Sequence, residues 1–269
     1  MDNFQHPTHQ PAGKKVAILG GNRIPFARSN GQYANVSNSE MLTAALNGLV
    51  ERYNLQDKRL GEVVAGAVIK LSRDINLTRE CVLSTALSPQ TPAYDISQAC
   101  ATGLQAAFAV SNKIALGLID SGIAGGVDTT SDAPLGIGDG LRKALLKLNN
   151  AKTNKDRLQA LLSINPKDLI DAPQNGEPRT KLSMGDHQAI TALEWAITRE
   201  AQDEFTFNSH KNLARAYDEG FFDDLITPFK GLTRDNNLRP DISLEKLASL
   251  KPVFGKKNAN PTMTAGNST

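Results

Sequence analysis

Cys100 is the residue whose type and position could most directly carry out chemistry. It lies in the segment QACATG (98–103), between a strand-like stretch and a helix-like stretch. Ligands of α/β sheets bind beyond the carboxyl ends of the strands. The unpaired N–H groups and the dipole of a helix N-terminus stabilise a thiolate. The position therefore suits a nucleophile that attacks a thioester, or that stores an acyl group as one.

Spacing alone leaves a structural interpretation of Cys100 open. The same position suits a helix-start cysteine that is buried against the sheet. Gly103, three residues further on, would let a ligand or a facing backbone approach closely. The second cysteine, Cys81, falls inside a helical stretch and is predicted to be a small core residue.

The segments around Cys100 predict the unit that positions it. Residues 92–97 (PAYDIS) are typical of a strand, and residues 121–127 (SGIAGGV) of another. Between them, residues 101–119 are helix-like, with an apolar stripe of Leu104, Phe108, Ala115 and Leu118. Strand, helix and strand in this order predict a βαβ unit with parallel strands and a right-handed crossover.

The chain before this unit also alternates between strand and helix patterns. The apolar run KKVAIL (14–19) predicts a buried strand, and EVVAGAV (62–68) predicts a second one. Ser37 and Glu40 form a capping-box signature at the start of a helix that continues to Tyr53. A further helix is predicted over 75–87, so residues 14–131 are expected to be α/β in character.

Composition changes near Asp132, and the chain to residue 260 is predicted to be a mostly helical insertion or a second subdomain. Its clearest helix has Thr198 as N-cap and runs to about Asp218, with Gly220 as the terminator. Because the sequence stops at TMTAGNST without a closing element, we expect truncation there.

Composition limits the classes of protein to consider. Forty per cent hydrophobic and 22% charged residues are ordinary for a globular protein. A net charge of +2 does not favour nucleic acid or a membrane surface as a partner. Two cysteines without metal-ligand spacing indicate a reducing compartment and no metal site. Residues 1–13 are polar and predicted to be a flexible tail, so a cytoplasmic location is expected.

The segment ISQACATGLQAAF (96–108) resembles the nucleophile segment of the thiolase family. Further segments resemble thiolase motifs in the same order along the chain: GGNRIPFAR (20–28), IAGGVDTTSDAP (123–134), SMGDHQAITALEWAITREAQDEF (183–205), LEKLASLKPVF (244–254) and TMTAGNST (262–269). The stretch SDAP…LRKALLKLNNAK further resembles the branch that contains the β subunit of the mitochondrial trifunctional protein and its bacterial relatives. The resemblance covers the chain from Val16 to Thr269. It implies a thiolase-like α/β fold, with a mixed sheet between helices in residues 14–131, a helical loop domain in 132–260 and a return segment to the N-terminal half in 261–269.

This resemblance implies an acyltransferase with coenzyme A and acyl-CoA as substrates and no covalently bound cofactor. Cys100 would take the acyl group from a 3-ketoacyl-CoA, release acetyl-CoA, and pass the acyl group to a second CoA. The reverse reaction would condense two acyl-CoA molecules. The family is dimeric or tetrameric, so a homo-oligomer is expected, and a hydratase/dehydrogenase subunit is a candidate partner.

Four other residues match substrate-binding positions of the family. Met184 would line the pantetheine tunnel, Arg239 would lie near the CoA nucleotide, and Ala265 and Thr269 would contact pantetheine. Thr269 stands where serine is usual. Each has a structural alternative: a core methionine, a solvated loop arginine, or residues that merely enter a strand. His187 is expected at most to line the site or to support a residue that does, and otherwise to be a surface histidine or one with its hydrogen bonds satisfied. His210 is expected to lie on a helix surface.

The family's other catalytic groups are a histidine in a GHP motif and a cysteine in a C-x-G motif. Neither motif occurs in this sequence. The resemblance places both in a C-terminal half, so residues 1–269 alone are expected to be inactive. Two further hypotheses stay open: a non-catalytic module that binds CoA or a partner subunit, and a condensing enzyme of the ketoacyl-synthase type.

Overall fold

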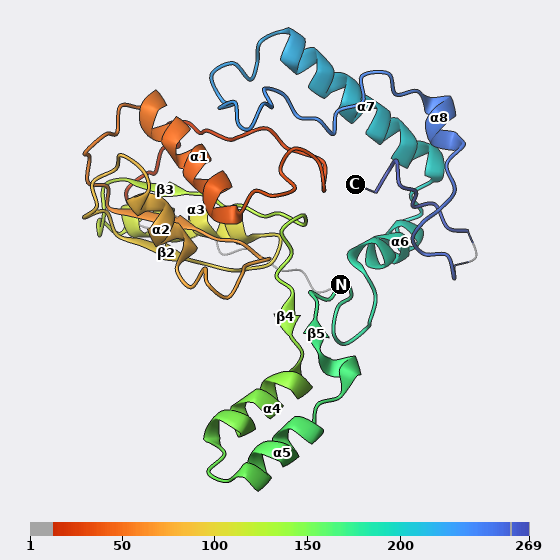
Figure 1. Cartoon of the computed structure of the whole chain (residues 1–269). Coiled ribbons are helices and arrows are strands. Elements are labelled where there is room, and N and C mark those ends of the chain that lie inside the picture. The colour runs from red at the N-terminus through yellow and green to blue at the C-terminus, as the bar shows by residue number, and fades with distance from the viewer. Residues whose placement is uncertain (1–12, 259, 269) are drawn as a thin grey trace. The chain divides into compact units, whose positions relative to one another are not determined.

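The computed structural model describes residues 13–258 and 260–268, which form two compact units. The first unit contains residues 13–25, 29–132 and 225–233. The second contains residues 26–28 and 133–224, and the described residues from 234 to 268 (Figure 1). The predicted tail falls on residues 1–12, outside the described residues, apart from its last residue. The domain boundaries proposed from the sequence stay predictions.

A three-stranded parallel sheet lies at the centre of the first unit. Its strands are β1 (Glu62–Ala65), β2 (Ala93–Asp95) and β3 (Gly122–Ala124), in the spatial order β2-β1-β3. Val63 pairs with Ala93 on one side and with Ile123 on the other. All four residues of β1 are buried, as expected for the central strand of a parallel sheet that is covered on both faces.

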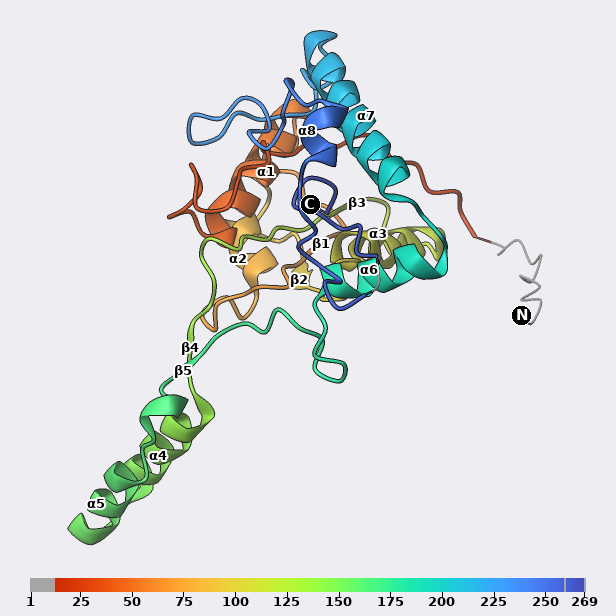
Figure 2. The same ribbon diagram turned by 90° about the vertical axis from the view of Figure 1, so that its right-hand side faces the viewer.

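Helices cover both faces of this sheet (Figure 2). Val63 and Ala65 pack in one core cluster with Leu46 of α1 (Asn38–Arg52) and Cys81 of α2 (Leu77–Leu83). Val64 points to the opposite face, where it packs with α3 (Thr102–Ala115). The alternation of side chains along β1 therefore places two helices on one face and α3 on the other.

The predicted capping box at the start of α1 is confirmed. The Ser37 hydroxyl accepts a hydrogen bond from the Glu40 backbone N–H, while the Glu40 carboxylate accepts one from the Ser37 backbone N–H. The α2 helix is shorter than the predicted range 75–87. After Leu83 the hydroxyls of Ser84 and Thr85 donate to backbone carbonyls of the last turn, where side chains of this type compete with the helix.

Two expectations for the first unit are wrong. Residues 14–19 do not form a buried strand: Ile18 is 94% and Leu19 88% exposed. An apolar run becomes a strand only when a neighbouring strand accepts and donates its backbone hydrogen bonds. The predicted apolar stripe of α3 also does not face the sheet. Leu104 and Phe108 are exposed. The buried residues of α3 are Thr102, Ala106 and Val110.

The second unit is mostly helical. A short antiparallel ribbon of β4 (Gly136–Ile137) and β5 (Ile170–Asp171) encloses a helical hairpin. The hairpin consists of α4 (Asp139–Asn150) and α5 (Asn154–Leu162), followed by the 3-10 turn η1 (Pro166–Asp168).

The remaining helices of the second unit are α6 (Met184–Glu194), α7 (Arg199–Asp218) and α8 (Leu244–Ala248). The predicted limits of α7 are confirmed. Thr198 caps it by accepting from the Ala201 N–H, and Gly220 follows it with a φ of +73°. No helix in the described parts of the chain is long and apolar enough to cross a membrane.

Candidate active site

Cys100 lies in the loop that connects β2 to α3, at the carboxyl end of the sheet. The loop leaves the sheet at Ile96, whose N–H donates to the Ala65 carbonyl at 2.9 Å. It ends where α3 begins at Thr102. Cys100 is exposed, whereas the structural alternative required it to be buried. The strand and the helix around the loop thus present the thiol at the edge where α/β sheets bind ligands.

The Thr102 side chain holds the loop in shape from within. Its hydroxyl accepts from the Gln98 N–H at 2.9 Å and donates to the Ala99 carbonyl at 2.7 Å. Ala99 has a φ of +46°, a left-handed conformation that costs a residue with a Cβ about 1–3 kcal/mol. Strained backbone directly before Cys100 is therefore stabilised by a buried hydroxyl two residues after it.

The N-terminus of α3 carries no side-chain cap. Its N-cap residue is Ala101, which makes no capping hydrogen bond from its side chain. A Cβ added at Gly103 would meet no described atom within 4 Å. The first turn of α3 therefore offers open space beside Cys100. This leaves room for a ligand, and no described backbone faces Gly103 at close range.

The loop that follows β1 packs against the Cys100 loop and is held in turn by the segment after β3. A Cβ on Gly66, directly after β1, would lie 1.9 Å from the carbonyl oxygen of Ile96. Asp128, beyond β3, accepts from the backbone N–H groups of Val68 and Ile69 at 2.8–3.1 Å. Sequence reasoning missed Gly66 and Asp128 because their contacts join segments that are distant in the chain.

At the end of β2, Asp95 binds the neighbouring loop and helix. It forms an ion pair with Lys70 at 2.6 Å and accepts from the backbone N–H groups of Leu77 and Thr78. Burial works to raise the pKa of Asp95, but the hydrogen bonds from Lys70 and Thr78 outweigh it and lower the pKa. Asp95 is thus an anion that fixes the end of the strand leading to Cys100.

Cys81 is buried, as predicted. Its thiol has no exposed surface and donates to the Ser39 carbonyl at 3.5 Å. Burial raises the pKa of this thiol. The two cysteines of the chain therefore differ sharply in environment, and only Cys100 is exposed.

The second unit contains a hollow of about 630 Å³, to which α6, α7 and the loop 262–268 contribute. Met184 and Gln188 line it from α6, Gln202 and Phe205 from α7, and Asn267 from the loop. Apolar side chains predominate, with amides and hydroxyls between them, a composition typical of sites for small molecules. The structure thus brings Met184 together with the loop 262–268.

The other predicted binding residues are more dispersed. Ala265 is exposed and does not belong to the residues that line the hollow. Thr269 lies outside the described residues. Arg239 is exposed, also apart from the lining residues of the hollow, and its backbone N–H donates to Nδ1 of His210 at 3.2 Å. Burial lowers the pKa of His210, and the charge of Arg239 lowers it further.

His187 has a hydrogen-bonding partner within its own unit. Its Nε2 lies 3.1 Å from the Thr180 hydroxyl, and it is not among the residues that line the hollow. In the described parts of the chain, no three His, Cys, Asp or Glu side chains gather as a metal site would require.

Comparisons with known proteins agree with this arrangement. Residues 16–269 match the family "Thiolase, N-terminal domain". The chain is 37% identical over 264 residues to the 3-ketoacyl-CoA thiolase of Pectobacterium carotovorum, covering 96% of the chain and 60% of the relative. It is also 37% identical over 265 residues to the 3-ketoacyl-CoA thiolase of Vibrio cholerae, with the same coverage.

A solved structure shows the same fold. The crystal structure of the Bacillus anthracis acetyl-CoA acetyltransferase matches with a TM-score of 0.77 and 26% identity, covering 95% of this chain and 62% of that one. The predicted α/β fold class is thereby confirmed. The chain spans 60% of the length of the curated relatives it matches. On the family match and the shared fold, the chain belongs to the thiolase family, whose N-terminal domain it contains.

Proposed function

We propose that the complete gene product is a thiolase that transfers acyl groups between coenzyme A molecules through Cys100. The observation that carries the proposal is the exposed thiol on a braced loop at the uncapped N-terminus of α3. The names of the curated relatives support 3-ketoacyl-CoA as the substrate class.

The reaction proposed for Cys100 is the one that the thiolase resemblance implies. The Cys100 thiolate attacks the 3-keto carbon, and the bond between C2 and C3 breaks. The acyl group remains on Cys100 as a thioester, and the acetyl-CoA carbanion takes up a proton and leaves. A CoA thiolate then attacks the acyl-enzyme and releases a shortened acyl-CoA. The N–H groups of the first turn of α3 favour the negative charge on the sulfur.

The acid and base groups of this cycle are proposed to lie outside residues 1–269. The family resemblance assigns them to a GHP histidine and a C-x-G cysteine, and neither motif occurs in this sequence. We therefore expect residues 1–269 alone to be inactive, because losing the base of a nucleophile–base pair lowers the rate by orders of magnitude. A purified chain 1–269 that turns over 3-ketoacyl-CoA would contradict this expectation.

The hollow of the second unit is the proposed site for the pantetheine arm of CoA. Met184 and the loop 262–268 line it, and the resemblance extends this contact to Ala265 and Thr269. Arg239 is proposed to bind the CoA nucleotide, where its exposed guanidinium would meet phosphate. A cytoplasmic homodimer or homotetramer, with a hydratase/dehydrogenase subunit as a further partner, completes the proposal.

Labelling of Cys100 tests the proposed function. The complete gene product is incubated with a radiolabelled acyl-CoA, denatured and digested, and the label is assigned by peptide mass. We expect the label on the Cys100 peptide, no label in Cys100→Ser, and thiolysis lost with it. A Cys100→Ser protein that keeps its thiolysis rate would refute the proposal. CoA binding without any acyl transfer would instead favour a non-catalytic CoA-binding module.

A further inference from the structure

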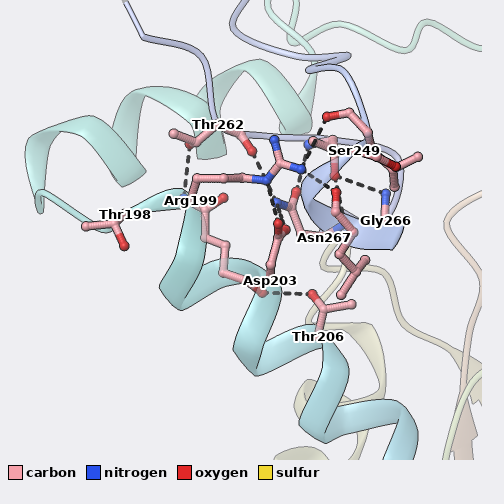
Figure 3. A network of polar contacts seen from close by, with 12 residues as sticks. Thr198, Arg199, Asp203, Thr206, Ser249, Thr262, Gly266 and Asn267 are labelled. Atoms are coloured by element: carbon pink, nitrogen blue, oxygen red, sulfur yellow. Dashed lines mark hydrogen bonds and ion pairs between the residues drawn. The ribbon is translucent and has the colours of Figure 1, made fainter. Parts of the chain in front are cut away.

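Asp203 is a buried carboxylate on α7 whose two oxygens both have partners (Figure 3). Its Oδ2 accepts from Nε of Arg199 at 2.8 Å, one turn earlier on the same helix. Its Oδ1 accepts from Nδ2 of Asn267 at 2.9 Å, across 64 residues of sequence. The positive charge of Arg199 balances the buried carboxylate. Because Arg199 binds Oδ2, the oxygen Oδ1 is left to bind the loop 262–268.

The Asn267 side chain closes this loop on itself. Its Nδ2 also donates to the Thr262 carbonyl at 3.1 Å, and its Oδ1 accepts from the Thr264 N–H at 2.7 Å. Thr264 is fully buried, and its hydroxyl accepts from the N–H groups of Gly266 and Asn267. The loop contains no helix and no regular strand, so side-chain hydrogen bonds hold its shape together with the backbone bridge between Thr264 and Pro252.

The same loop contributes a wall of the hollow. Met263, Asn267 and Ser268 line the hollow, beside Gln202 and Phe205 of α7. Gln202 adds a parallel contact, because its Nε2 donates to the Thr262 hydroxyl at 3.0 Å. Asp203 does not line the hollow itself. Its effect on a ligand there would pass through Asn267.

We propose that Asp203 is a positioning residue for CoA: through Asn267, it holds the loop 262–268 in the shape that binds the pantetheine arm. This inference rests on the proposed function of the hollow. It assigns to Asp203 a role in CoA affinity that is separable from chemistry at Cys100.

The substitution Asp203→Asn removes the charge of the carboxylate and one of its two acceptor oxygens at nearly constant side-chain volume. The new amide must point its NH₂ group toward Arg199 or toward Asn267, and both of these are donors. If Asn267 turned its amide over, its own NH₂ would face the Thr264 N–H instead. The network therefore contains a donor–donor contact in every arrangement, and the loop loses its fixed shape.

An exchange of the two side chains restores the link. In Asp203→Asn with Asn267→Asp, the residue 203 oxygen accepts from Arg199 and its NH₂ group donates to the residue 267 carboxylate. That carboxylate still accepts from the Thr264 N–H. Only the donation to the Thr262 carbonyl is lost, and the net charge is unchanged. Partial recovery in this double variant is a result that a general loss of packing would not produce.

The test uses steady-state thiolysis by the complete gene product, with CoA varied. Asp203→Asn is expected to raise KM for CoA about tenfold or more, with kcat within about twofold of wild type. In the double variant, at least about half of this increase in log KM is expected to be reversed. The matched control is Glu204→Gln, which makes the same charge change at the next, exposed residue of α7 and should keep the wild-type KM.

Hydrogen exchange provides a readout that does not depend on activity. The N–H groups of Thr264, Gly266 and Asn267 are all hydrogen-bonded, so their exchange should accelerate in Asp203→Asn and slow again in the double variant. An unchanged KM for CoA in Asp203→Asn, or no recovery in the double variant, would overturn the inference. Absence of thiolysis in the wild type would refute the proposed function instead. In that case the CoA affinity of the wild type and of each variant, measured by calorimetry, would replace KM as the test of the role of Asp203.

Discussion

The carbonyl oxygen of Ile96 occupies the space that a side chain on residue 66 would need. A Cβ at Gly66 would lie 1.9 Å from this oxygen and 3.0 Å from Cγ2 of Thr102. Gly66 follows the central strand β1, and Ile96 begins the loop that carries Cys100. The close approach of these two backbones fixes how the Cys100 loop leaves the sheet.

Gly66→Ala is therefore expected to displace the Cys100 loop. The added methyl group meets backbone rather than a flexible side chain, so the clash can only be relieved by moving the loop. We expect the free energy of unfolding to fall by about 2 kcal/mol or more and acylation of Cys100 to slow. Urea unfolding and single-turnover acylation would measure both. A variant with wild-type stability and acylation rate would show that the loop can move without consequence.

Gly103→Ala tests the open space at the start of α3. The added Cβ meets no described atom within 4 Å, and alanine is the better helix former. We expect the free energy of unfolding to rise by up to about 1 kcal/mol. If an acyl-CoA approaches this turn, the same methyl group should slow acylation of Cys100 about tenfold. Increased stability with unchanged acylation would mean that the substrate does not approach Gly103.

Thr102→Val removes the hydroxyl that braces the Cys100 loop while keeping the shape of the side chain. The Gln98 N–H and the Ala99 carbonyl both lose their partner. Thr102 is 5% exposed, so water cannot fully replace the hydroxyl. We expect a loss of about 1–3 kcal/mol in unfolding free energy and slower acylation. Thr102→Ser retains both hydrogen bonds and is the matched control; equal losses in the two variants would contradict this explanation.

Local patterns predicted the parts of the fold that local contacts determine. The Ser37 capping box and the Thr198 N-cap were correct because the partners lie three residues apart. The apolar run 14–19 was misleading, since a strand needs a neighbour that the run itself does not specify. The stripe of Leu104 and Phe108 was misleading because α3 has apolar residues on more than one face, and spacing cannot tell which face meets the sheet.

The candidate site was predictable only in part for the same reason. The position of Cys100 between a strand and a helix follows from its own segment. Contacts such as that of Gly66 with Ile96, or of Asp203 with Asn267, join residues 30 and 64 positions apart, so periodicity does not indicate them. The positive φ of Ala99 carries no signal either, because alanine rarely adopts it.

Asp95 should contribute stability that depends on pH. Its pKa is lowered below the usual 3.8, so its contribution is complete above that pH and is lost as the pH falls through the lowered value. Asp95→Asn should cost about 1–3 kcal/mol near neutral pH, and the difference from wild type should shrink in acid. Urea unfolding of both proteins, from neutral pH to below the lowered pKa of Asp95, measures the difference in unfolding free energy. Asp120→Asn, at a side chain that is 97% exposed, is the control; a constant difference for Asp95→Asn would contradict the prediction.

The two cysteines should differ in their reaction with iodoacetamide. Cys100 is exposed, whereas Cys81 has no exposed surface and its pKa is raised by burial, so its reactive thiolate is scarce at neutral pH. In the folded complete gene product we expect alkylation of the Cys100 peptide and not of the Cys81 peptide, measured by mass spectrometry. In urea both peptides should react. Acyl-CoA added beforehand should protect Cys100, because the acylated sulfur is no longer a nucleophile. Alkylation of Cys81 in the folded protein at the rate of Cys100 would show that the helix carrying Cys81 opens readily, contrary to its packing in the core.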